Sequence, residues 1–494
     1  MSHKPDPNKS VNLTIDGLPV TVPEGTRILE AAKKVGVHIP VLCEHPELCK
    51  RAVCRICTVE CDGRGKLLAA CASDVWEGVN VVTHNARLVS IRKTIIELIL
   101  ANHPQECLNC IRNKNCELQS LAANYGIRES SFRHDALDRN PPVTESMTIV
   151  RDMNKCVKCG RCVETCQEVQ TVRAINSSHR STHYEISAPY GESPADGSCV
   201  FCGQCAEVCP VGAIYEHDQG AETWAALGNS ESKTALQFDP AFTAAFDVAL
   251  GLPPKTVTPG KLITAFKRIG FDKVFSDTYF ADTATAMINH ELMNHIKQGG
   301  KLPMISGCSQ GWTKFVENFY GDLLDHVHPY LSSQQVFGEK VKSLFPEKIT
   351  AVSVEPCLAK KYKSPQSIDL VLTIKEAGRM FLLAGINFID LPESPFDTIP
   401  EETLAKNTGI PYQASFHAVQ GLDGVEEAEV SLKGSKVKLM IVHGLASARK
   451  IMDSIRRGEC DASFVEIMCC PGNRAGCRSI SSCLPDALSK LDKQ

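Results

Sequence analysis

The pattern of apolar and polar positions predicts a small α+β unit at the N-terminus. The stretch VNLTIDGLPVTV (11–22) alternates apolar and polar residues on both sides of Asp16-Gly17, which predicts a short β-hairpin. Apolar residues recur at helical spacing in TRILEAAKKVG (26–36) and in ARLVSIRKTIIELILANH (86–103), which predicts two helices. From about residue 104 to 220 apolar periodicity is weak, so metal binding has to replace a hydrophobic core there.

After about residue 220, strand-like apolar runs alternate with amphipathic helices. KLPMIS (301–306) precedes WTKFVENFY (312–320), and VKLMIVHG (437–444) precedes ASARKIMDSIRRG (446–458). This alternation predicts a parallel sheet covered by helices. The segments near residues 306, 357 and 470 follow strands, where open α/β folds place their functional loops.

Composition adds a strong indication of metal binding. A chain of 494 residues is too long for one core, and a net charge of -4 argues against general affinity for nucleic acid or anionic membranes. The polar N-terminus and the lack of an apolar segment of about 18 residues predict a cytoplasmic protein. In that compartment 24 cysteines, mostly grouped at Cys-x-x-Cys spacing, indicate metal ligands and not disulfides.

The first group of candidate ligands lies on the loop after the first predicted helix. Four thiolates supplied mostly by one loop suit a [2Fe-2S] cluster, with a structural zinc site as the alternative. The group consists of Cys43, Cys54, Cys57 and Cys71.

The second group follows the second predicted helix with the spacing H-x3-C-x2-C-x5-C. One histidine beside three cysteines suits zinc or a [4Fe-4S] cluster, and the position between two iron-sulfur patterns favours [4Fe-4S]. The group consists of His103, Cys107, Cys110 and Cys116.

CVKCGRCVETC and CVFCGQCAEVCP are two bacterial ferredoxin runs, in which the fourth cysteine of each run ligates the other cluster. Two [4Fe-4S] clusters are therefore expected, for which zinc is the alternative. One would be held by Cys156, Cys159, Cys162 and Cys209, and the other by Cys199, Cys202, Cys205 and Cys166. Four clusters so close together predict an electron path, which needs a redox partner at each end.

The order of these motifs resembles the catalytic subunit of [FeFe]-hydrogenases from about residue 10 to 485, and the first 217 residues also resemble the large iron-sulfur subunit of respiratory complex I. The resemblance implies a multidomain α+β and α/β protein. Its expected domains are a β-grasp [2Fe-2S] ferredoxin domain (1–84), a [4Fe-4S] domain with one histidine and three cysteine ligands (85–145), a bacterial-type 2[4Fe-4S] ferredoxin domain (146–218) and a hydrogenase-like α/β domain (219–494).

The hydrogen-activating site of that family is only partly kept. The resemblance places Cys308 at the proton-transfer cysteine and Cys357 and Cys470 at ligands of the [4Fe-4S] cube. Ser309 replaces a third cube ligand, and Arg474 replaces the cysteine that bridges the cube and the diiron unit. The family's cyanide-facing lysine is matched by Lys360, whereas Glu355 stands where the family has methionine, and Met287 and Ile288 replace paired glutamates of the proton path. These changes imply a hydrogenase fold without a hydrogenase site, so no catalytic residue is expected.

The remaining C-terminal cysteines leave two alternatives open. Cys308, Cys357, Cys470 and Cys477 could hold a further [4Fe-4S] cluster, or they could be packed thiols in an empty pocket. Structural roles are expected for Cys460, Cys469 and Cys483. Iron content separates the alternatives, because the four N-terminal clusters need about 14 irons per chain and a further cube raises this to about 18.

The function that these features favour is electron transfer in a cytoplasmic, flavin-based electron-bifurcating NAD(P)H/ferredoxin oxidoreductase, similar to transhydrogenases of the Stn type. A true or sensory [FeFe]-hydrogenase with unusual ligands and a docking scaffold are the alternatives. No G-x-G-x-x-G loop follows a predicted strand, so FMN or FAD and NAD(P) are expected on partner subunits. The expected partners are an NADH-binding flavin and iron-sulfur subunit, a small thioredoxin-like [2Fe-2S] subunit or an NADPH-binding flavoprotein subunit, and soluble ferredoxin.

Overall fold

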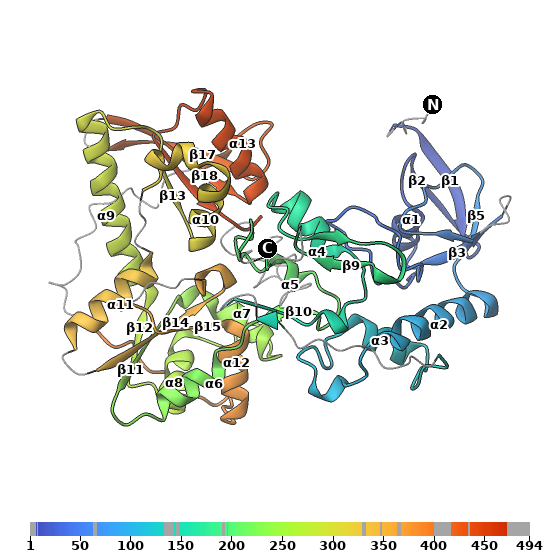
Figure 1. The fold of residues 1–494 in the computed structure, drawn as a ribbon, viewed down its shortest axis with the longest axis horizontal. Helices are drawn as coiled ribbons and strands as arrows, with labels where there is room; N and C mark the ends of the chain where they lie inside the picture. Colours follow the sequence, from blue (N-terminus) through green and yellow to red (C-terminus); the bar gives the residue numbers. More distant parts are fainter. Residues whose placement is uncertain are drawn as a thin grey trace.

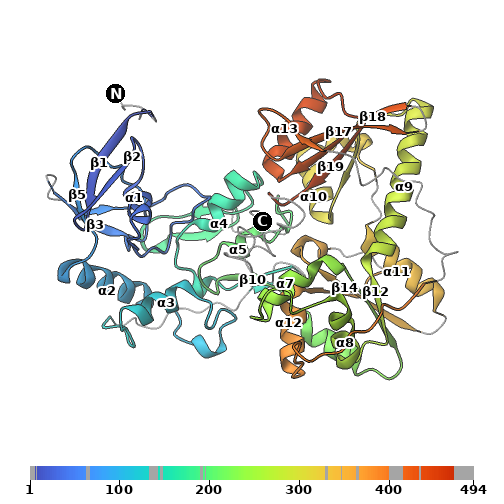
Figure 2. The ribbon, with the colours of Figure 1, turned by 180° about the vertical axis from the view of Figure 1, so that it is seen from behind.

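The chain folds into an N-terminal sheet, a middle region and a large domain that follow one another along the longest axis (Figure 1). The view from behind shows the same order, with α4 and α5 between the two ends (Figure 2). The computed structural model describes residues 6, 8–62, 67–132, 143–144, 148–189, 193–194, 196–328, 332–345, 348–362, 367–399, 416–432 and 435–471.

The N-terminal sheet contains the predicted hairpin. Its five strands run in the order β2-β1-β5-β3-β4: β1 (Ser10–Ile15), β2 (Leu18–Pro23), β3 (Thr58–Cys61), β4 (Leu67–Ala69) and β5 (Asn80–Val82). β1 pairs antiparallel with β2, and Asp16 and Gly17 make the turn with positive φ angles of 50° and 81°. Helix α1 (Ile28–Lys34) covers the sheet and buries Ile28 and Ala31 in the same core as Cys57 and Cys71. The hairpin and first helix are confirmed.

Two helices lead from this sheet into the middle region. α2 (Ala86–Ala101) begins where the Asn85 side chain accepts a hydrogen bond from the Leu88 N–H (2.8 Å), and it ends just before His103. The short η1 (Cys107–Asn109) and α3 (Glu117–Asn124) follow.

The middle region has short elements and loops. Its elements are β6 (Val143–Thr144), β7 (Ile149–Arg151), η2 (Met153–Lys155), α4 (Arg161–Glu164), η3 (Thr165–Val169), β8 (Asn176–Ser178), η4 (Ser181–His183), β9 (Glu185–Ser187), α5 (Gln204–Glu207) and β10 (Ile214–Glu216). The region does have small apolar clusters, but cysteine side chains are part of them: Cys162 packs with Val163, Ile175 and Ile214. The cysteines therefore contribute to the little core that exists here.

The large domain contains two sheets where the sequence predicted one. The first is parallel throughout, in the order β12-β11-β14-β15: β11 (Lys233–Phe238), β12 (Lys273–Ser276), β14 (Ile349–Glu355) and β15 (Leu370–Thr373). Around it lie α6 (Gly220–Leu227), η6 (Pro240–Phe242), α7 (Thr243–Ala249), α8 (Pro259–Ile269), α11 (Ser333–Leu344) and α12 (Ile374–Leu383). Its core contains Leu236, Phe266, Val352 and Phe381.

The second sheet is mixed, in the order β13-β19-β18-β17-β16: β13 (Met304–Gly307), β16 (His417–Ala418), β17 (Val425–Leu432), β18 (Ser435–His443) and β19 (Phe464–Met468). β13, β19 and β18 are parallel, whereas β17 pairs antiparallel with β18. It is accompanied by α10 (Gln310–Phe319), η7 (Gly321–His326) and α13 (Leu445–Arg456). α9 (Asp277–Gln298) runs along one side of the domain from one sheet to the other (Figure 1).

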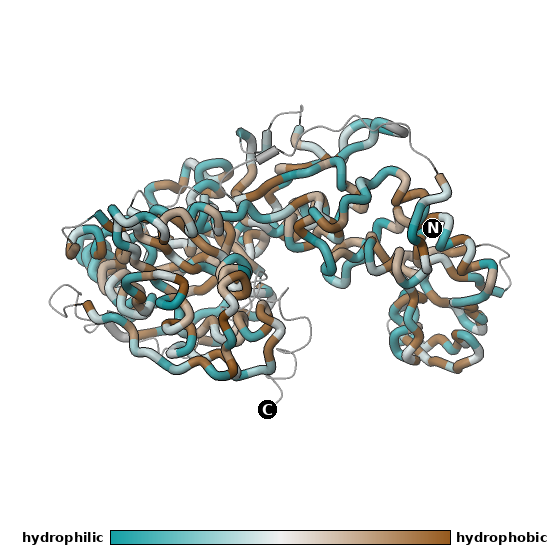
Figure 3. The backbone as a smooth tube through the Cα atoms, turned by 90° about the horizontal axis from the view of Figure 1, so that it is seen from below, coloured by the Kyte–Doolittle hydropathy of each residue, from teal (hydrophilic) through white to brown (hydrophobic). Residues whose placement is uncertain are grey.

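Apolar and polar positions mix along the backbone at both ends of the molecule (Figure 3). None of the helices in the described part of the chain combines the length and the apolar character that crossing a membrane requires.

Candidate metal centres

The four thiols after α1 come together as two contacting pairs. The Cys54 thiol donates a hydrogen bond to the Cys43 sulfur and lowers the pKa of Cys43 to about 6. The Cys71 thiol likewise donates to Cys57 and lowers the pKa of Cys57 to about 7. Each iron of a [2Fe-2S] cluster takes two thiolates, and metal–sulfur bonds of about 2.3 Å place those sulfurs about 3.8 Å apart. Two contacting pairs therefore fit this cluster.

The end of α2 presents a histidine suited to ligation. Burial, followed by the nearby Lys155 charge, lowers the pKa of His103 to about 4, so the imidazole is neutral at pH 7. His103 has a backbone hydrogen bond with Lys155, while its Nδ1 is buried and has no partner among the described residues. A histidine that binds a metal through one ring nitrogen commonly makes such a hydrogen bond with the other ring nitrogen. Burial raises the pKa of Cys116, and the charges of Cys110 and Cys107 raise it further.

The cysteines of the two ferredoxin runs lie near one another, and their predicted exchange of the last ligand stays a prediction. Burial raises the pKa of Cys156 to about 11 and that of Cys159 to about 12, and in both cases the charge of Cys209 from the other run contributes. Burial also raises the pKa of Cys205, with contributions from Cys199 and from Cys166 of the first run. Binding iron to these thiols must release protons.

In the part of the chain that the structure describes, no three His, Cys, Asp or Glu side chains are arranged to hold a single metal ion. The cluster assignments therefore rest on ligand spacing and on the grouping of thiols, and they stay predictions.

Three of the four N-terminal cysteine groups are packed against one another. One apolar cluster around Leu42, Ile56 and Val211 also contains cysteines of three groups: Cys54, Cys116, Cys156 and Cys209. A Cβ on Gly212 would lie 2.7 Å from the Cys110 sulfur, so the absence of a side chain lets the two segments meet.

A buried arginine fixes this arrangement. The Arg161 guanidinium donates to both carboxylate oxygens of Glu117 (2.6 and 2.8 Å) and to the Glu44 backbone carbonyl (2.8 Å). It thereby connects one ferredoxin run with the loops of both preceding groups.

The other ferredoxin run packs directly on the large domain. A Cβ on Gly203 would lie 2.4 Å from Leu358 Cδ1, and a Cβ on Gly311 would lie 2.7 Å from the Val200 carbonyl. The Gln204 amide donates to the Cys470 sulfur (3.7 Å). This junction brings the loops after β13, β14 and β19 to the second ferredoxin cluster site.

A fully buried ion pair supports the same junction. Lys361 Nζ binds Glu376 (2.6 Å) and the His217 carbonyl (2.7 Å), and both charged side chains have 0% exposure. Lys361 and His217 belong to the two parts that meet here, so the charge pair holds the end of the middle region on the large domain.

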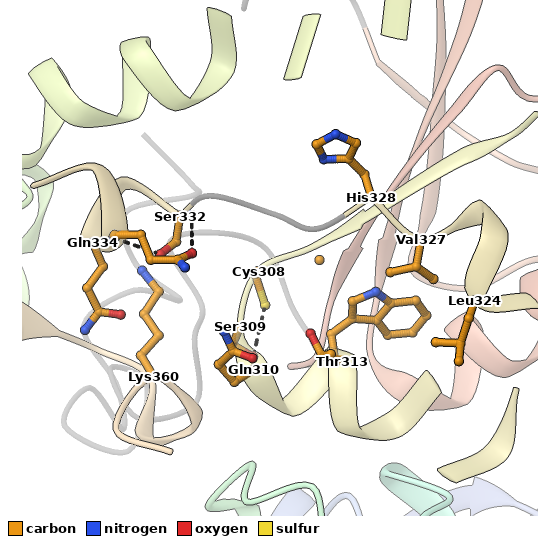
Figure 4. Close-up of a pocket in the computed structure, with 13 residues that line it drawn as sticks. Cys308, Ser309, Gln310, Thr313, Leu324, Val327, His328, Ser332, Gln334 and Lys360 are labelled. Atoms are coloured by element: carbon orange, nitrogen blue, oxygen red, sulfur yellow. Dashed lines mark hydrogen bonds between the residues drawn. The ribbon is translucent and has the colours of Figure 1, made fainter. Parts of the chain in front are cut away.

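Behind the junction lies a cavity of about 410 Å³ (Figure 4). Figure 4 shows Cys308 between the Lys360 side chain and the apolar pair Leu324 and Val327. Polar side chains complete the lining: Ser309, Gln310, Thr313, His328, Ser332, Gln334 and Gln335. The loop of Cys308 and the loop of Lys360, two of the three that the resemblance implies, thus meet at this cavity, whereas its lining includes no residue of the loop after β19.

The charges beside this cavity neutralise one another. Lys360 Nζ lies 2.7 Å from Glu355 Oε2, and Ser353 Oγ donates to the other Glu355 oxygen (2.8 Å). Burial raises the pKa of Asp277 to about 6, and the Glu355 charge adds to this rise. The sequence analysis found that Glu355 stands where the family has methionine, but it did not predict the ion pair between Glu355 and Lys360.

Cys469 is the cysteine whose position the sequence did not anticipate. Its thiol donates to the Cys308 sulfur, its backbone N–H donates to the same sulfur (3.5 Å), and together they lower the pKa of Cys308 to about 7. The charge of Cys357 acts on Cys469 as well. The signal in the sequence that could have revealed this contact was the presence of two adjacent cysteines, Cys469 and Cys470, directly after a predicted strand. Of the other expected residues, Arg474, Cys477 and Cys483 lie outside the described residues.

Ile288, in the expected proton path, packs in an apolar cluster with Leu292 and Met304. At this position the chain therefore has an apolar side chain in a hydrophobic contact, and not a side chain that can carry a proton.

Comparison with known families matches the chain along most of its length. The profile described as "Iron only hydrogenase large subunit, C-terminal domain" matches residues 232–478. A 2Fe-2S iron-sulfur cluster binding domain matches residues 8–86, an NADH-ubiquinone oxidoreductase-G iron-sulfur binding region matches 92–131, and the ferredoxin-like domain of NADH-quinone oxidoreductase subunit 3 matches 146–215. The expected fold class is confirmed, while the domain boundaries stay predictions.

Individual relatives match in the same way. NADP-reducing hydrogenase subunit HndD of Solidesulfovibrio fructosivorans is 33% identical over 94% of this chain and 88% of its own length. Iron hydrogenase 1 of Clostridium pasteurianum is 29% identical over 97% of this chain and 90% of its length. The alpha subunit of the NADPH-Fe(3+) oxidoreductase of Geobacter sulfurreducens is 36% identical over 41% of this chain and 24% of its length. With a profile that matches half of its length and a 33% identical relative along nearly all of it, the chain belongs to the family of iron-only hydrogenase large subunits.

Proposed function

We propose that this chain is the iron-sulfur electron-transfer subunit of a multi-subunit oxidoreductase that moves electrons between NAD(P)H and ferredoxin and does not activate hydrogen. The observation that carries the proposal is the continuous series of packed cysteine groups, which ends beside a cavity whose lysine is held in an ion pair. The names of relatives, an NADP-reducing hydrogenase subunit and an NADPH-Fe(3+) oxidoreductase subunit, support a nicotinamide-linked complex.

Electrons would enter from a partner's flavin at one of two places. The group containing Cys43 and the group containing Cys156 share an apolar cluster, so either would feed the same path. The ligands are then the functional residues, and the chain needs no acid, base or nucleophile of its own. We place FMN or FAD and NAD(P) on partner subunits, and ferredoxin or a second flavoprotein at the other end of the path. Electron bifurcation and a cytoplasmic location complete the proposal.

Two features argue against hydrogen chemistry. Ser309 lines the cavity where the family's resemblance requires a cube ligand, and a hydroxyl is a poor ligand for iron in such a cluster. The Lys360 cation, which the resemblance assigns to a cyanide ligand, instead contacts Glu355 at 2.7 Å. An anionic diiron unit would have to compete with that carboxylate.

The test is to purify the holoprotein anaerobically with its associated subunits and to follow the clusters by visible absorption and EPR after adding NADH or NADPH. We expect cluster reduction only when a flavoprotein subunit copurifies. Cys57→Ser should remove about two irons per chain and slow electron entry if the flavin docks at the N-terminal sheet. Cys61→Ser is the matched control, because Cys61 is buried in the same core and lies outside the ligand group.

Hydrogen evolution is the decisive counter-test. After maturation with the diiron cofactor, we expect no hydrogen turnover above that of protein without it. Turnover that depends on the cofactor would favour the [FeFe]-hydrogenase alternative. If removal of residues 220–494 abolished complex assembly and left cluster reduction intact, the large domain would be a docking scaffold.

A further inference from the structure

Two thiols outside the four N-terminal cysteine groups contact each other beside the cavity. Cys308 follows β13 and Cys469 follows β19, and these strands are parallel neighbours in which Gly307 pairs with Ile467. The Cys308 N–H donates to the Ile467 carbonyl (3.0 Å), and the Cys469 N–H donates to the Cys308 sulfur (3.5 Å). The two side chains are hydrogen-bonded as well. Adjacent strands thus hold both sulfurs in place.

This contact differs from what a cube requires. In a [4Fe-4S] cluster each iron takes one thiolate, so ligand thiolates belong to different irons, whereas contacting thiols can form an S–S bond of about 2.05 Å. Ser309 Oγ lies 3.7 Å from the Cys469 sulfur and 3.9 Å from the Cys308 sulfur, which adds a polar neighbour to both. The two sulfurs are in hydrogen-bond contact, which brings them close enough for a disulfide to form between them.

The pair also lies next to the electron path. Cys469 is a member, and Cys308 a neighbour, of the apolar cluster that packs against Cys166, Cys199 and Cys202. Those three residues are expected ligands of the second ferredoxin cluster. The chain contacts at Gly311 and Cys470 bring the two loops onto the same ferredoxin run.

We propose that Cys308 and Cys469 form a redox-active pair that exchanges electrons with the adjacent ferredoxin clusters; this rests on the proposed electron-transfer function. Reduction breaks the S–S bond and takes up two electrons, one from each of two reduced [4Fe-4S] clusters. Two protons from water reaching the polar cavity convert the sulfurs to thiols. Oxidation forms the bond again and returns the electrons and protons. The pair therefore stores two electrons at the end of a path of one-electron centres.

The test is a reductive titration of the anaerobic holoprotein with dithionite, counting electrons taken up per chain. We expect the oxidised wild type to accept two more electrons than Cys469→Ser or Cys308→Ser, and non-reducing peptide maps to show a 308–469 crosslink that reduction removes. Cys460→Ser is the control, because Cys460 borders the same apolar cluster and should leave the count unchanged. Cys469→Ala serves as a second variant that keeps the site apolar.

Iron content and melting temperature are measured on every variant, so a folding failure is recognised directly. Equal electron counts in wild type and Cys469→Ala, or the absence of the crosslink in oxidised protein, would overturn the proposal. So would an iron content near 18 that falls by about four in Cys469→Ala, because Cys469 would then be a cluster ligand. The titration uses a chemical reductant without partner subunits, so failure of NAD(P)H-dependent reduction leaves its result unaffected.

Discussion

At the scale of single residues, His103 is the clearest case of a side chain adapted to its position. Burial and Lys155 keep its imidazole neutral, and one buried ring nitrogen remains without a partner among the described residues. Three cysteines, at positions 107, 110 and 116, complete the group. A neutral ligand among thiolates makes the cluster less negative and easier to reduce.

Replacing His103 by cysteine should therefore lower the reduction potential of this cluster. An added thiolate raises the negative charge, and the potentials of clusters with mixed ligation suggest a shift of roughly 100 mV or more. An EPR-monitored redox titration measures it. His84→Gln is the control, because the His84 side chain is 75% exposed and lies on the preceding loop. An unchanged potential in His103→Cys would mean that His103 is not a ligand.

At the scale of elements, the contact between α5 and the loop after β14 joins the ferredoxin region to the large domain. Gly203 precedes α5 with a φ of +74°, and an added Cβ would lie 2.4 Å from Leu358 Cδ1. Gly299 ends α9 with a similar φ of +67° and has nothing within 4 Å. The two glycines share the left-handed backbone and differ in the space that an added Cβ would meet.

Gly203→Ala should consequently damage the junction more than Gly299→Ala damages α9. Both variants carry a left-handed backbone penalty of about 1 kcal/mol, and only Gly203→Ala adds an overlap of about 1–3 kcal/mol. The local loss of stability can be measured as faster amide hydrogen exchange at η8 (Leu358–Lys360) and at the start of α10. Equal exchange in the two variants would show that Leu358 can move aside at little cost.

The elements also show what the sequence could and could not predict. The grouping of the cysteines was predictable because Cys-x-x-Cys thiols lie on one loop, and the loops after β13 and β14 could be placed because each follows an apolar strand. The contact of Cys308 with Cys469 depends on the register of β13 against β19, which are distant in sequence. The division into two sheets depends on α9, whose length of 22 residues lets it connect them, and apolar periodicity alone carries no such information.

At the scale of the whole molecule, the large domain and the middle region differ in how they are stabilised. The large domain has apolar cores of its own, with residues such as Phe266 and Phe381 fully buried. In the middle region the apolar clusters include the candidate ligands, among them Cys162 and Cys205. Iron–sulfur bonds should therefore supply much of the folding free energy there and little of it in the large domain.

Removal of iron by a chelator under reducing conditions should unfold the middle region and spare the large domain. Hydrogen exchange is expected to lose protection at β7 and β10 while β11 and β14 retain it. Re-adding iron and sulfide should restore protection, which separates loss of metal from damage to the chain. Simultaneous loss of protection in all four strands would show that the large domain depends on the clusters as well.

The ion pair of Lys360 with Glu355 has a consequence for protein engineering. Restoring the missing cysteines at Ser309 and Arg474 would supply sulfur ligands and would leave the lysine engaged by a carboxylate 2.7 Å away. Glu355 is itself held by Ser353, which belongs to the same buried strand. A design that converts this protein into a hydrogen-activating enzyme should begin with Glu355→Met, and the ligand substitutions should follow.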